Sequence, residues 1–318
     1  MTTPSVGVLN ANNILFIATN EPRVRYYLMQ CALWRSVRRS SYNGFHTPAE
    51  RISKSSKGYL MFIETQGTRL FVSSFGASNR TALALGGWIG SGEMWLPVLG
   101  LLNRSWRTVT FDQRGSGTSH VPKDRDITRE AWVDDVFAVM DAQGIERCLV
   151  MSDSSGCFPA VLAASKHPER FTGLVLVGGA PRMPLDWKRR LFALSLRFAS
   201  RPILRVFTRM CLPEDEIGHV RRWLWDICVR ADPRNAIRLL KILDGYDLTD
   251  VAPKLLTPTL ILHGSKDLIQ PLSDGRALAS LIPGSDLVVM EGKGHVPMMS
   301  SPEEVVAIIE KWTRERNV

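Results

Sequence analysis

The sequence predicts an α/β fold in which a mostly parallel central sheet is flanked by helices and carries an inserted all-helical cap. From Arg107 onward β-rich runs alternate with helical runs, which is typical of parallel β-α-β units. Between residues 184 and 255 the strands stop and only helical runs remain, after which the alternation resumes. We therefore expect a core made of residues 58–183 and 256–318. The helical cap is inserted at 184–255, and residues 1–57 form a separate basic extension.

Each element follows from its pattern of apolar residues. Two β-rich runs flank Gln66-Gly67, a pair of turn residues that predicts a hairpin. Because ligand sites of such sheets lie beyond the carboxyl ends of the parallel strands, a site is expected at that edge. The strands are expected at residues 58–64, 68–75, 80–85, 107–111, 147–151, 171–177, 257–264 and 286–290. The helices are expected at residues 129–143, 158–166, 274–281 and 302–313 in the core, and at 187–198, 202–210 and 214–230 in the cap.

The composition is that of an ordinary globular protein and argues against several other classes. The chain has 318 residues, of which 45% are hydrophobic and 22% charged, so it can bury a large core. Its five cysteines are scattered and form no C-x-x-C pair, which argues against a disulfide framework and against a zinc site. No apolar run has the length of a membrane span, and the N-terminus lacks the pattern of a secretory signal. These features favour a cytoplasmic protein that uses no metal and no cofactor.

Positive charge is concentrated in the N-terminal extension. The net charge is +9, and residues 1–57 hold eight Lys or Arg against two Glu. A basic leader on a nearly balanced body, without a recognisable nucleic-acid-binding motif, argues against a nucleic-acid partner. Apolar residues at helical spacing between Arg23 and Arg39 predict a partly amphipathic helix. Three roles for the extension stay open: packing on the body, weak contact with a membrane surface or a partner, and import into an organelle.

The turn around Ser154 has the features of a nucleophile elbow. This motif presents a serine on a tight, strained turn between a strand and a helix, and it needs small residues two positions before and two positions after. Ser152 and Gly156 meet that demand. Since the turn follows a β-rich run and precedes an alanine-rich helical run, Ser154 is the candidate nucleophile.

A serine hydroxyl needs a base to remove its proton and an acid to hold that base in one tautomer. His295 is the candidate base because it stands in a glycine-flanked loop just past the last predicted strand. Asp267 is the candidate acid because it lies in the loop after the strand at 257–264, whereas residues 178–181, at the rival position, contain no carboxylate. The chain order Ser154, Asp267, His295 is the one expected of serine hydrolases built on an elbow.

The negative charge that develops on a substrate oxygen needs two positioned N–H donors. The backbone N–H of Ser155 is one candidate, because it follows the nucleophile at a helix start. The backbone N–H of Trp88 is the other, in the loop that begins with Gly86 and Gly87, where glycine lets the backbone approach closely.

The substrate pocket is expected to be apolar, because the cap is rich in aromatic residues. Asp153, just before the nucleophile, is an unusual occupant whose carboxylate is expected to pair with a nearby cation or to repel anionic substrates. The candidate pocket residues are Trp88, Asp153, Trp187 and Trp223.

Further motifs resemble those of the alpha/beta-hydrolase superfamily, from Gly58 to about Val318. Residues 111–119 resemble its Asp-x-Arg-Gly-x-Gly-x-Ser loop, and residues 93–95 resemble its helix start after the oxyanion loop. Residues 167–170 and 258–264 also match. The resemblance implies the alpha/beta-hydrolase fold.

Three positions depart from the pattern of that superfamily. The oxyanion loop begins with Gly86-Gly87 where His-Gly is usual, and the elbow begins with Ser152 where glycine is usual. Cys157 also replaces a common glycine. None of the three changes removes a catalytic group.

The resemblance and the candidate triad together predict hydrolysis of a carboxylic ester or lactone through an acyl-enzyme intermediate on Ser154. The expected partner is a small-molecule substrate with an apolar portion. Similar proteins also include carbon-carbon bond hydrolases, aminopeptidases, perhydrolases and non-catalytic receptor or sensor modules, and these alternatives stay open. A serine nucleophile argues against epoxide hydrolases and haloalkane dehalogenases, which use an aspartate. Asp153 cannot take that role, because its elbow would require a small residue in place of Met151.

Overall fold

The computed structural model describes residues 8–11, 14–17, 58–123, 125–183 and 187–318. The core is one eight-stranded sheet with the order β12-β11-β8-β7-β5-β6-β4-β3. The first two strands, β3 (Tyr59–Thr65) and β4 (Thr68–Phe75), form an antiparallel hairpin at one end of the sheet. Its two turn residues, Gln66 and Gly67, both have positive φ, as the type I′ hairpin turn requires.

From β6 onward the sheet is parallel. β4 pairs with β6 antiparallel, and every later pairing in the order is parallel. Every residue of β5, β7 and β11 is buried, as expected of strands that are covered on both faces. The parallel strands are β5 (Thr81–Leu85), β6 (Arg107–Phe111), β7 (Cys148–Asp153), β8 (Phe171–Val177), β11 (Thr259–Gly264) and β12 (Asp286–Met290).

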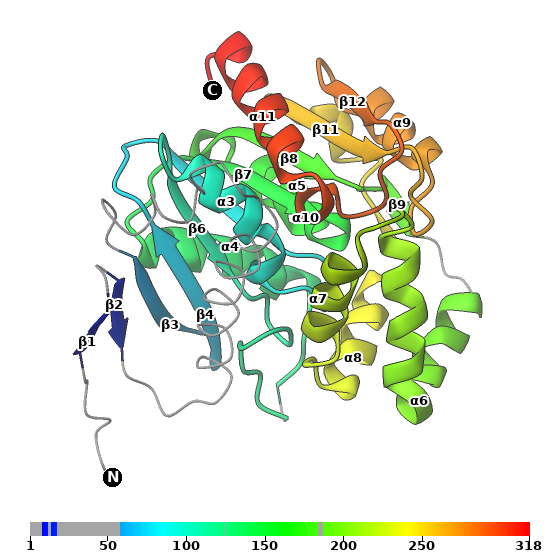
Figure 1. Cartoon of the computed structure of the whole chain (residues 1–318). Coiled ribbons are helices and arrows are strands. Elements are labelled where there is room, and N and C mark those ends of the chain that lie inside the picture. The colour runs from blue at the N-terminus through cyan, green and yellow to red at the C-terminus, as the bar shows by residue number, and fades with distance from the viewer. Residues whose placement is uncertain (1–7, 12–13, 18–57, 124, 184–186) are drawn as a thin grey trace.

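Helices cover both faces of this sheet (Figure 1). Helix α3 packs on α11, and α4 packs on α5. α3 connects β5 to β6, whereas α4 and α5 connect strands in the opposite direction along the sheet. Because such crossovers are right-handed, α3 lies on the opposite face of the sheet from α4 and α5. The core helices are α3 (Leu96–Leu102), α4 (Arg129–Ala142), α5 (Cys157–Lys166), α9 (Leu272–Leu281), α10 (Pro297–Ser300) and α11 (Pro302–Arg316).

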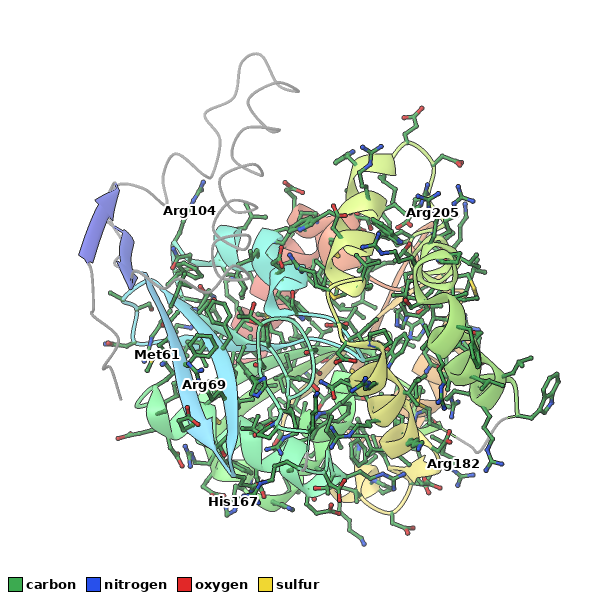
Figure 2. All side chains as sticks on the ribbon, turned by 90° about the horizontal axis from the view of Figure 1, so that it is seen from below. Met61, Arg69, Arg104, His167, Arg182 and Arg205 are labelled. Atoms are coloured by element: carbon green, nitrogen blue, oxygen red, sulfur yellow. The ribbon has the colours of Figure 1, made fainter. Side chains whose placement is uncertain are left out.

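The inserted segment forms three helices: α6 (Trp187–Cys211), α7 (Gly218–Cys228) and α8 (Pro233–Leu243). Two short strands, β9 (Arg182–Met183) and β10 (Tyr246–Asp247), pair antiparallel where the segment leaves and rejoins the core. Figure 2 shows α6 on the side of the molecule away from β3 and β4.

Within α6, Ala199 has non-helical backbone angles, so two helical stretches meet at a kink that lies between the runs expected at 187–198 and 202–210. Elsewhere the insert differs from the sequence prediction in two respects. α8 was not predicted, although the side chain of Asp232 caps it and Pro233 occupies its first turn. The two-residue strands β9 and β10 were also missed, because such short strands carry no periodicity.

The N-terminal region contains an antiparallel pair, β1 (Val8–Ala11) and β2 (Ile14–Ile17). The helix predicted between Arg23 and Arg39 lies outside the described residues. Within the described residues, none of the helices combines the length and apolarity that crossing a membrane requires.

Two loops at the carboxyl edge of the sheet approach each other closely at Gly264, the last residue of β11. A Cβ atom at Gly264 would overlap the backbone carbonyl oxygens of Lys293 and Gly294. Glycine therefore lets the loop after β11 contact the loop after β12, so that Asp267 and His295 belong to adjoining loops.

We expect Gly264→Ala to lower the free energy of unfolding by about 1–3 kcal/mol, because the new methyl group meets rigid backbone. Urea unfolding measures this change. Gly218→Ala is the matched control, since a Cβ atom at Gly218 meets nothing within 4 Å. Equal stability of the two variants would contradict the close approach.

Candidate active site

Ser154 lies on a strained turn at the carboxyl edge of the sheet. Its φ is +52°, in the left-handed region, which costs a residue with a side chain about 1–2 kcal/mol. The turn is held between β7, which ends at Asp153, and α5, which begins at Cys157. A Cβ atom at Gly156 would lie 2.6 Å from the carbonyl oxygen of Gly86, so this position requires glycine. The turn thus has the geometry of the predicted elbow.

His295 and Asp267 form a buried pair from the two adjoining loops. Nδ1 of His295 lies 2.6 Å from Oδ2 of Asp267. The other carboxylate oxygen, Oδ1, accepts hydrogen bonds from the backbone N–H groups of Ile269 (2.8 Å) and Gln270 (2.9 Å). These contacts fix the carboxylate, which holds the proton of the imidazole on Nδ1 and leaves Nε2 as the nitrogen that can accept a proton.

The two side chains shift each other's pKa in opposite directions. Burial lowers the pKa of His295, but the charge and hydrogen bond of Asp267 together with the charge of Asp153 outweigh it, so the pKa is raised above 6.5. Burial raises the pKa of Asp267, but the charge and hydrogen bond of His295 and the two backbone N–H groups outweigh it, so the pKa is lowered. The pair therefore favours an ionised carboxylate beside a basic imidazole.

His263 supports the same loop from β11, a contribution that the sequence did not indicate. It is fully buried, and its Nε2 lies 2.9 Å from the backbone oxygen of Gln270. The same nitrogen is 3.5 Å from Oδ2 of Asp267. His263 therefore acts on the position of the Asp267 loop.

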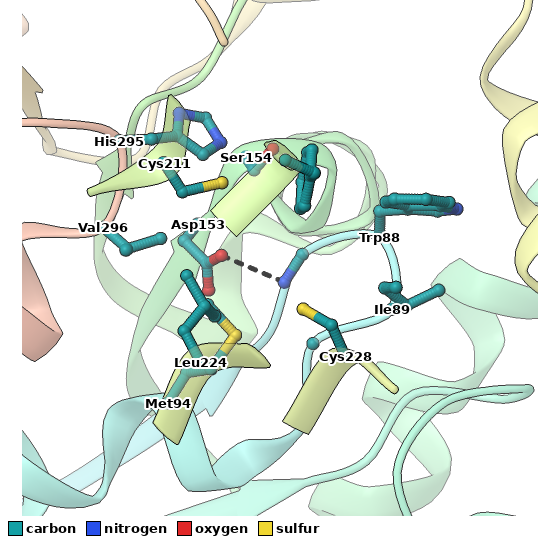
Figure 3. Close-up of a pocket in the computed structure, with 13 residues that line it drawn as sticks. Trp88, Ile89, Met94, Asp153, Ser154, Cys211, Leu224, Cys228, His295 and Val296 are labelled. Carbon is teal, nitrogen blue, oxygen red and sulfur yellow. Dashed lines mark hydrogen bonds between the residues drawn. The ribbon is translucent and has the colours of Figure 1, made fainter. Parts of the chain in front are cut away.

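Ser154 and His295 line one small cavity between the core and the cap (Figure 3). Its volume is about 30 Å³, enough for about two water molecules. Most of the lining is apolar or contains sulfur. From the cap, α6 contributes Phe207 and Cys211, and α7 contributes Leu224 and Cys228. From the core come Ile89, Met94 and Val296, together with Gly87, Trp88, Gly90 and Asp153.

The candidate oxyanion donors lie beside the nucleophile. Trp88 lines the cavity with Ser154, and Ser155 is buried at the helical turn that follows it. The indole Nε1 of Trp88 donates to the backbone oxygen of Ala236 in α8, which ties this loop to the cap. Among the described residues, the backbone N–H of Trp88 forms no hydrogen bond.

Asp153 connects the elbow to the oxyanion loop. Its Oδ2 accepts a hydrogen bond from the backbone N–H of Gly87 (3.1 Å), and its Oδ1 accepts one from Nε1 of Trp95 (2.9 Å). This differs from the sequence expectation of a paired cation, because two neutral N–H donors hold the carboxylate. Burial raises its pKa to about 6, while the charge of His295 and these hydrogen bonds lower it.

Two of the expected pocket residues lie elsewhere. Trp187 is 68% exposed on the outer side of α6 and does not line the cavity. Trp223 is also outside the lining, because its Nε1 donates to Oε1 of Glu93 at 3.2 Å. Glu93 forms a salt bridge with Arg230 as well, so the two cap residues fasten α7 to the core rather than contact the cavity.

The cap also holds the loop that carries His295. The backbone N–H of His295 donates to the carbonyl oxygen of Cys211, the last residue of α6 (2.8 Å). The backbone N–H of Gly294 donates to Oε1 of Glu214 (3.0 Å). These contacts could not be predicted from the sequence, because they join loop residues that have no characteristic pattern.

Among the described residues, no group of three or more His, Cys, Asp or Glu side chains is arranged to hold a metal ion. The four described cysteines are buried and free, and burial raises the pKa of the Cys157 and Cys228 thiols to about 12.

We expect Asp153→Ala to lower the free energy of unfolding by about 1–3 kcal/mol, because the buried N–H of Gly87 loses its acceptor. Urea unfolding measures the loss. Asp250→Ala removes an exposed carboxylate and should leave the stability within about 0.5 kcal/mol of wild type. If the two variants were equally stable, the proposed role of Asp153 in holding the oxyanion loop would be wrong.

Comparison with known proteins agrees with this geometry. The model of the alpha/beta hydrolase family matches residues 82–308. A putative carbamate hydrolase RutD of Caulobacter sp. (strain K31) is 26% identical over 250 residues, which cover 73% of this chain and 90% of the relative. A thermophilic esterase from Thermogutta terrifontis is 26% identical with a TM-score of 0.73, over 82% of this chain and all of that structure. The enol-lactonase from Burkholderia xenovorans LB400 is 23% identical with a TM-score of 0.75, over 80% of this chain and all of that structure. Because the family model matches more than half of the chain, including most of its core and its cap, the chain belongs to the alpha/beta hydrolase family.

Proposed function

We propose that the chain is a serine hydrolase that cleaves a carboxylic ester or lactone through an acyl-enzyme on Ser154. One observation carries the proposal: a serine on a left-handed elbow and an Asp267-bound histidine line the same cavity. The names of its relatives, an esterase, an enol-lactonase and a putative carbamate hydrolase, support attack at an acyl carbonyl. Buried free cysteines support a reducing, cytoplasmic location.

In the first half-reaction, Oγ of Ser154 attacks the carbonyl carbon while Nε2 of His295 takes the hydroxyl proton. The resulting imidazolium is stabilised by Asp267, whose carboxylate stays ionised. His295 then gives the proton to the leaving alkoxide oxygen, and the carbon–oxygen bond breaks. In a lactone this oxygen remains attached to the acyl chain.

In the second half-reaction, His295 takes a proton from water, and the hydroxide attacks the acyl-enzyme. The proton returns to Oγ of Ser154 as the acid leaves. In both tetrahedral intermediates, the negative oxygen accepts hydrogen bonds from the backbone N–H groups of Trp88 and Ser155. Asp153 holds the loop of the first donor through Gly87.

The cavity favours a small apolar acyl portion. Its volume of about 30 Å³ is far below the roughly 300–1,000 Å³ of pockets that enclose larger ligands. Since four of its lining residues belong to α6 and α7, a longer acyl chain requires the cap to move. We therefore expect short-chain nitrophenyl esters to be better substrates than long-chain ones.

Incubation with a fluorophosphonate probe should add one adduct to Ser154, because the triad activates this serine alone. Intact mass and peptide mass spectrometry measure the adduct. Ser154→Ala should abolish it and lower kcat for nitrophenyl acetate by about 10⁶-fold. Ser155→Ala is the matched control, since it keeps the backbone N–H and should still be labelled.

A wild-type chain without a Ser154 adduct would instead favour a non-catalytic receptor. The same proteins should be assayed against a short-chain lactone and a nitrophenyl carbamate. If Ser154 were labelled but only the carbamate were turned over, Ser154 would still be the nucleophile. The assignment to an ester or lactone substrate would then be wrong.

The pH dependence of kcat/KM for nitrophenyl acetate should follow the protonation of His295. Because its pKa is raised, the imidazolium persists to higher pH, and the rate should rise through an apparent pKa above 6.5. Asp267→Asn removes the main charge that raises this pKa, so the inflection should move to lower pH. The rate should also fall by about 10⁴-fold. An inflection that is unchanged in Asp267→Asn would count against His295 as the titrating base.

A further inference from the structure

The solvent side of α6 carries an apolar surface that packing in the described structure does not use. Six large apolar side chains of α6 are exposed, four before the kink at Ala199 and two after it, and only two other exposed large apolar side chains, Leu256 and Leu268, occur in the rest of the described residues. We call this surface the α6 outer face. Its apolar members are Trp187 (68% exposed), Leu191 (57%), Leu194 (53%), Phe198 (79%), Val206 (57%) and Met210 (38%).

The helical spacing makes this face continuous before the kink. Trp187, Leu191, Leu194 and Phe198 follow one another at intervals of four, three and four, so they form one stripe about 17 Å long. The opposite side of α6 is already occupied by packing, since Leu196 and Leu204 are buried. The outer stripe is thus additional to the apolar side that holds the helix on the core.

Positive charge accompanies the apolar stripe. α6 contains seven Lys or Arg and no Asp or Glu in its 25 residues. Exposed arginines lie beside the apolar side chains in both halves of the helix; Figure 2 marks Arg205. Within the described part of the chain, none of these arginines pairs with a carboxylate. They are Arg190, Arg197, Arg201, Arg205 and Arg209.

A groove of about 440 Å³ between α6 and α8 extends the same surface. Leu194 belongs both to the apolar stripe and to this groove, and Arg190, Arg197 and Lys241 surround it with positive charge. The carboxylate among the residues that line it, Asp244, is paired with Arg189 at 3.0 Å. The groove therefore combines apolar contact with the positive charge of Arg190, Arg197 and Lys241, which pair with no carboxylate among the described residues.

Charge decides which occupant fits this face. A second copy of the chain would place one row of arginines against another, and the N-terminal extension is itself basic, with eight Lys or Arg against two Glu. An anionic phospholipid surface complements both features, because its phosphates pair with arginine and its interfacial layer accepts Trp, Leu and Phe side chains.

We propose that the α6 outer face docks the cap on an anionic membrane surface. Its apolar side chains enter the interfacial layer, while the exposed arginines bind lipid phosphates. The helix lies along the surface and does not cross it. This inference does not depend on the reaction assigned to Ser154.

Flotation of the full chain with vesicles tests the proposal. Wild type should bind vesicles of phosphatidylcholine mixed with phosphatidylglycerol, and should bind pure phosphatidylcholine much more weakly. A triple variant that removes three of the arginines should bind roughly 100-fold more weakly, at about fivefold for each lost charge. Its substitutions are Arg190→Gln, Arg197→Gln and Arg201→Gln. Leu191→Ser, Leu194→Ser and Phe198→Ser combined should weaken it at least about tenfold.

Matched variants away from this face keep the test specific. Arg104→Gln, Arg276→Gln and Arg314→Gln remove the same charge from exposed positions elsewhere, and Leu256→Ser removes an 83% exposed leucine. This triple arginine variant and the Leu256→Ser variant should each bind like wild type. Because all changed side chains are exposed, thermal unfolding should be unaffected, which separates lost binding from lost folding.

Several outcomes would overturn the proposal. The proposal would be wrong if wild type bound neither kind of vesicle, or bound both kinds equally well. It would also fail if the α6 variants bound like wild type while Arg35→Gln, Arg38→Gln and Arg39→Gln combined abolished binding, since the extension would then be the anchor. Concentration-dependent dimers that only the apolar variant loses, without vesicle binding, would assign the face to a second copy.

Discussion

The left-handed backbone of Ser154 is the constraint on which the rest of the site depends. A residue with a side chain adopts this conformation at a cost of about 1–2 kcal/mol, so the surrounding structure must hold it there. β7 and α5 do so from both sides, and Gly156 allows the backbone of Gly86 to pass within contact distance. Because the same turn positions Asp153, the strain at Ser154 is coupled to the loop that carries the candidate oxyanion donor.

The inserted helices help to form the candidate active site as well as covering it. It supplies much of the apolar lining, and the end of α6 accepts a hydrogen bond from the backbone of His295. Trp88 and Glu93 fasten the oxyanion side of the core to α8 and α7. Movement of the cap would therefore change both the volume of the cavity and the support of His295. α6 also carries the outer apolar and cationic face. The continuous stripe of this face lies before the kink at Ala199, and the residues of α6 that line the cavity lie after it.

Much of the core could be predicted because parallel strands have regular patterns. The ranges expected for β4, β6, β8 and β12 agree with the structure at both ends. The residues proposed for the triad could be selected from sequence because loops at the carboxyl ends of parallel strands meet at one edge. The structure brings Asp267 and His295 into contact there, and it places Ser154 and His295 on one cavity.

The sequence by itself determined the order of the elements, the elbow and the set of loops at the active edge, since these follow from local spacing and from residue types such as glycine. Only the tertiary structure decided what each polar or aromatic side chain contacts. It placed Asp153 against Gly87 and Trp95, Trp223 on Glu93, and Trp187 in solvent. These contacts join residues far apart in the chain, and an amphipathic cap helix has the same pattern whichever of its apolar residues reach the cavity.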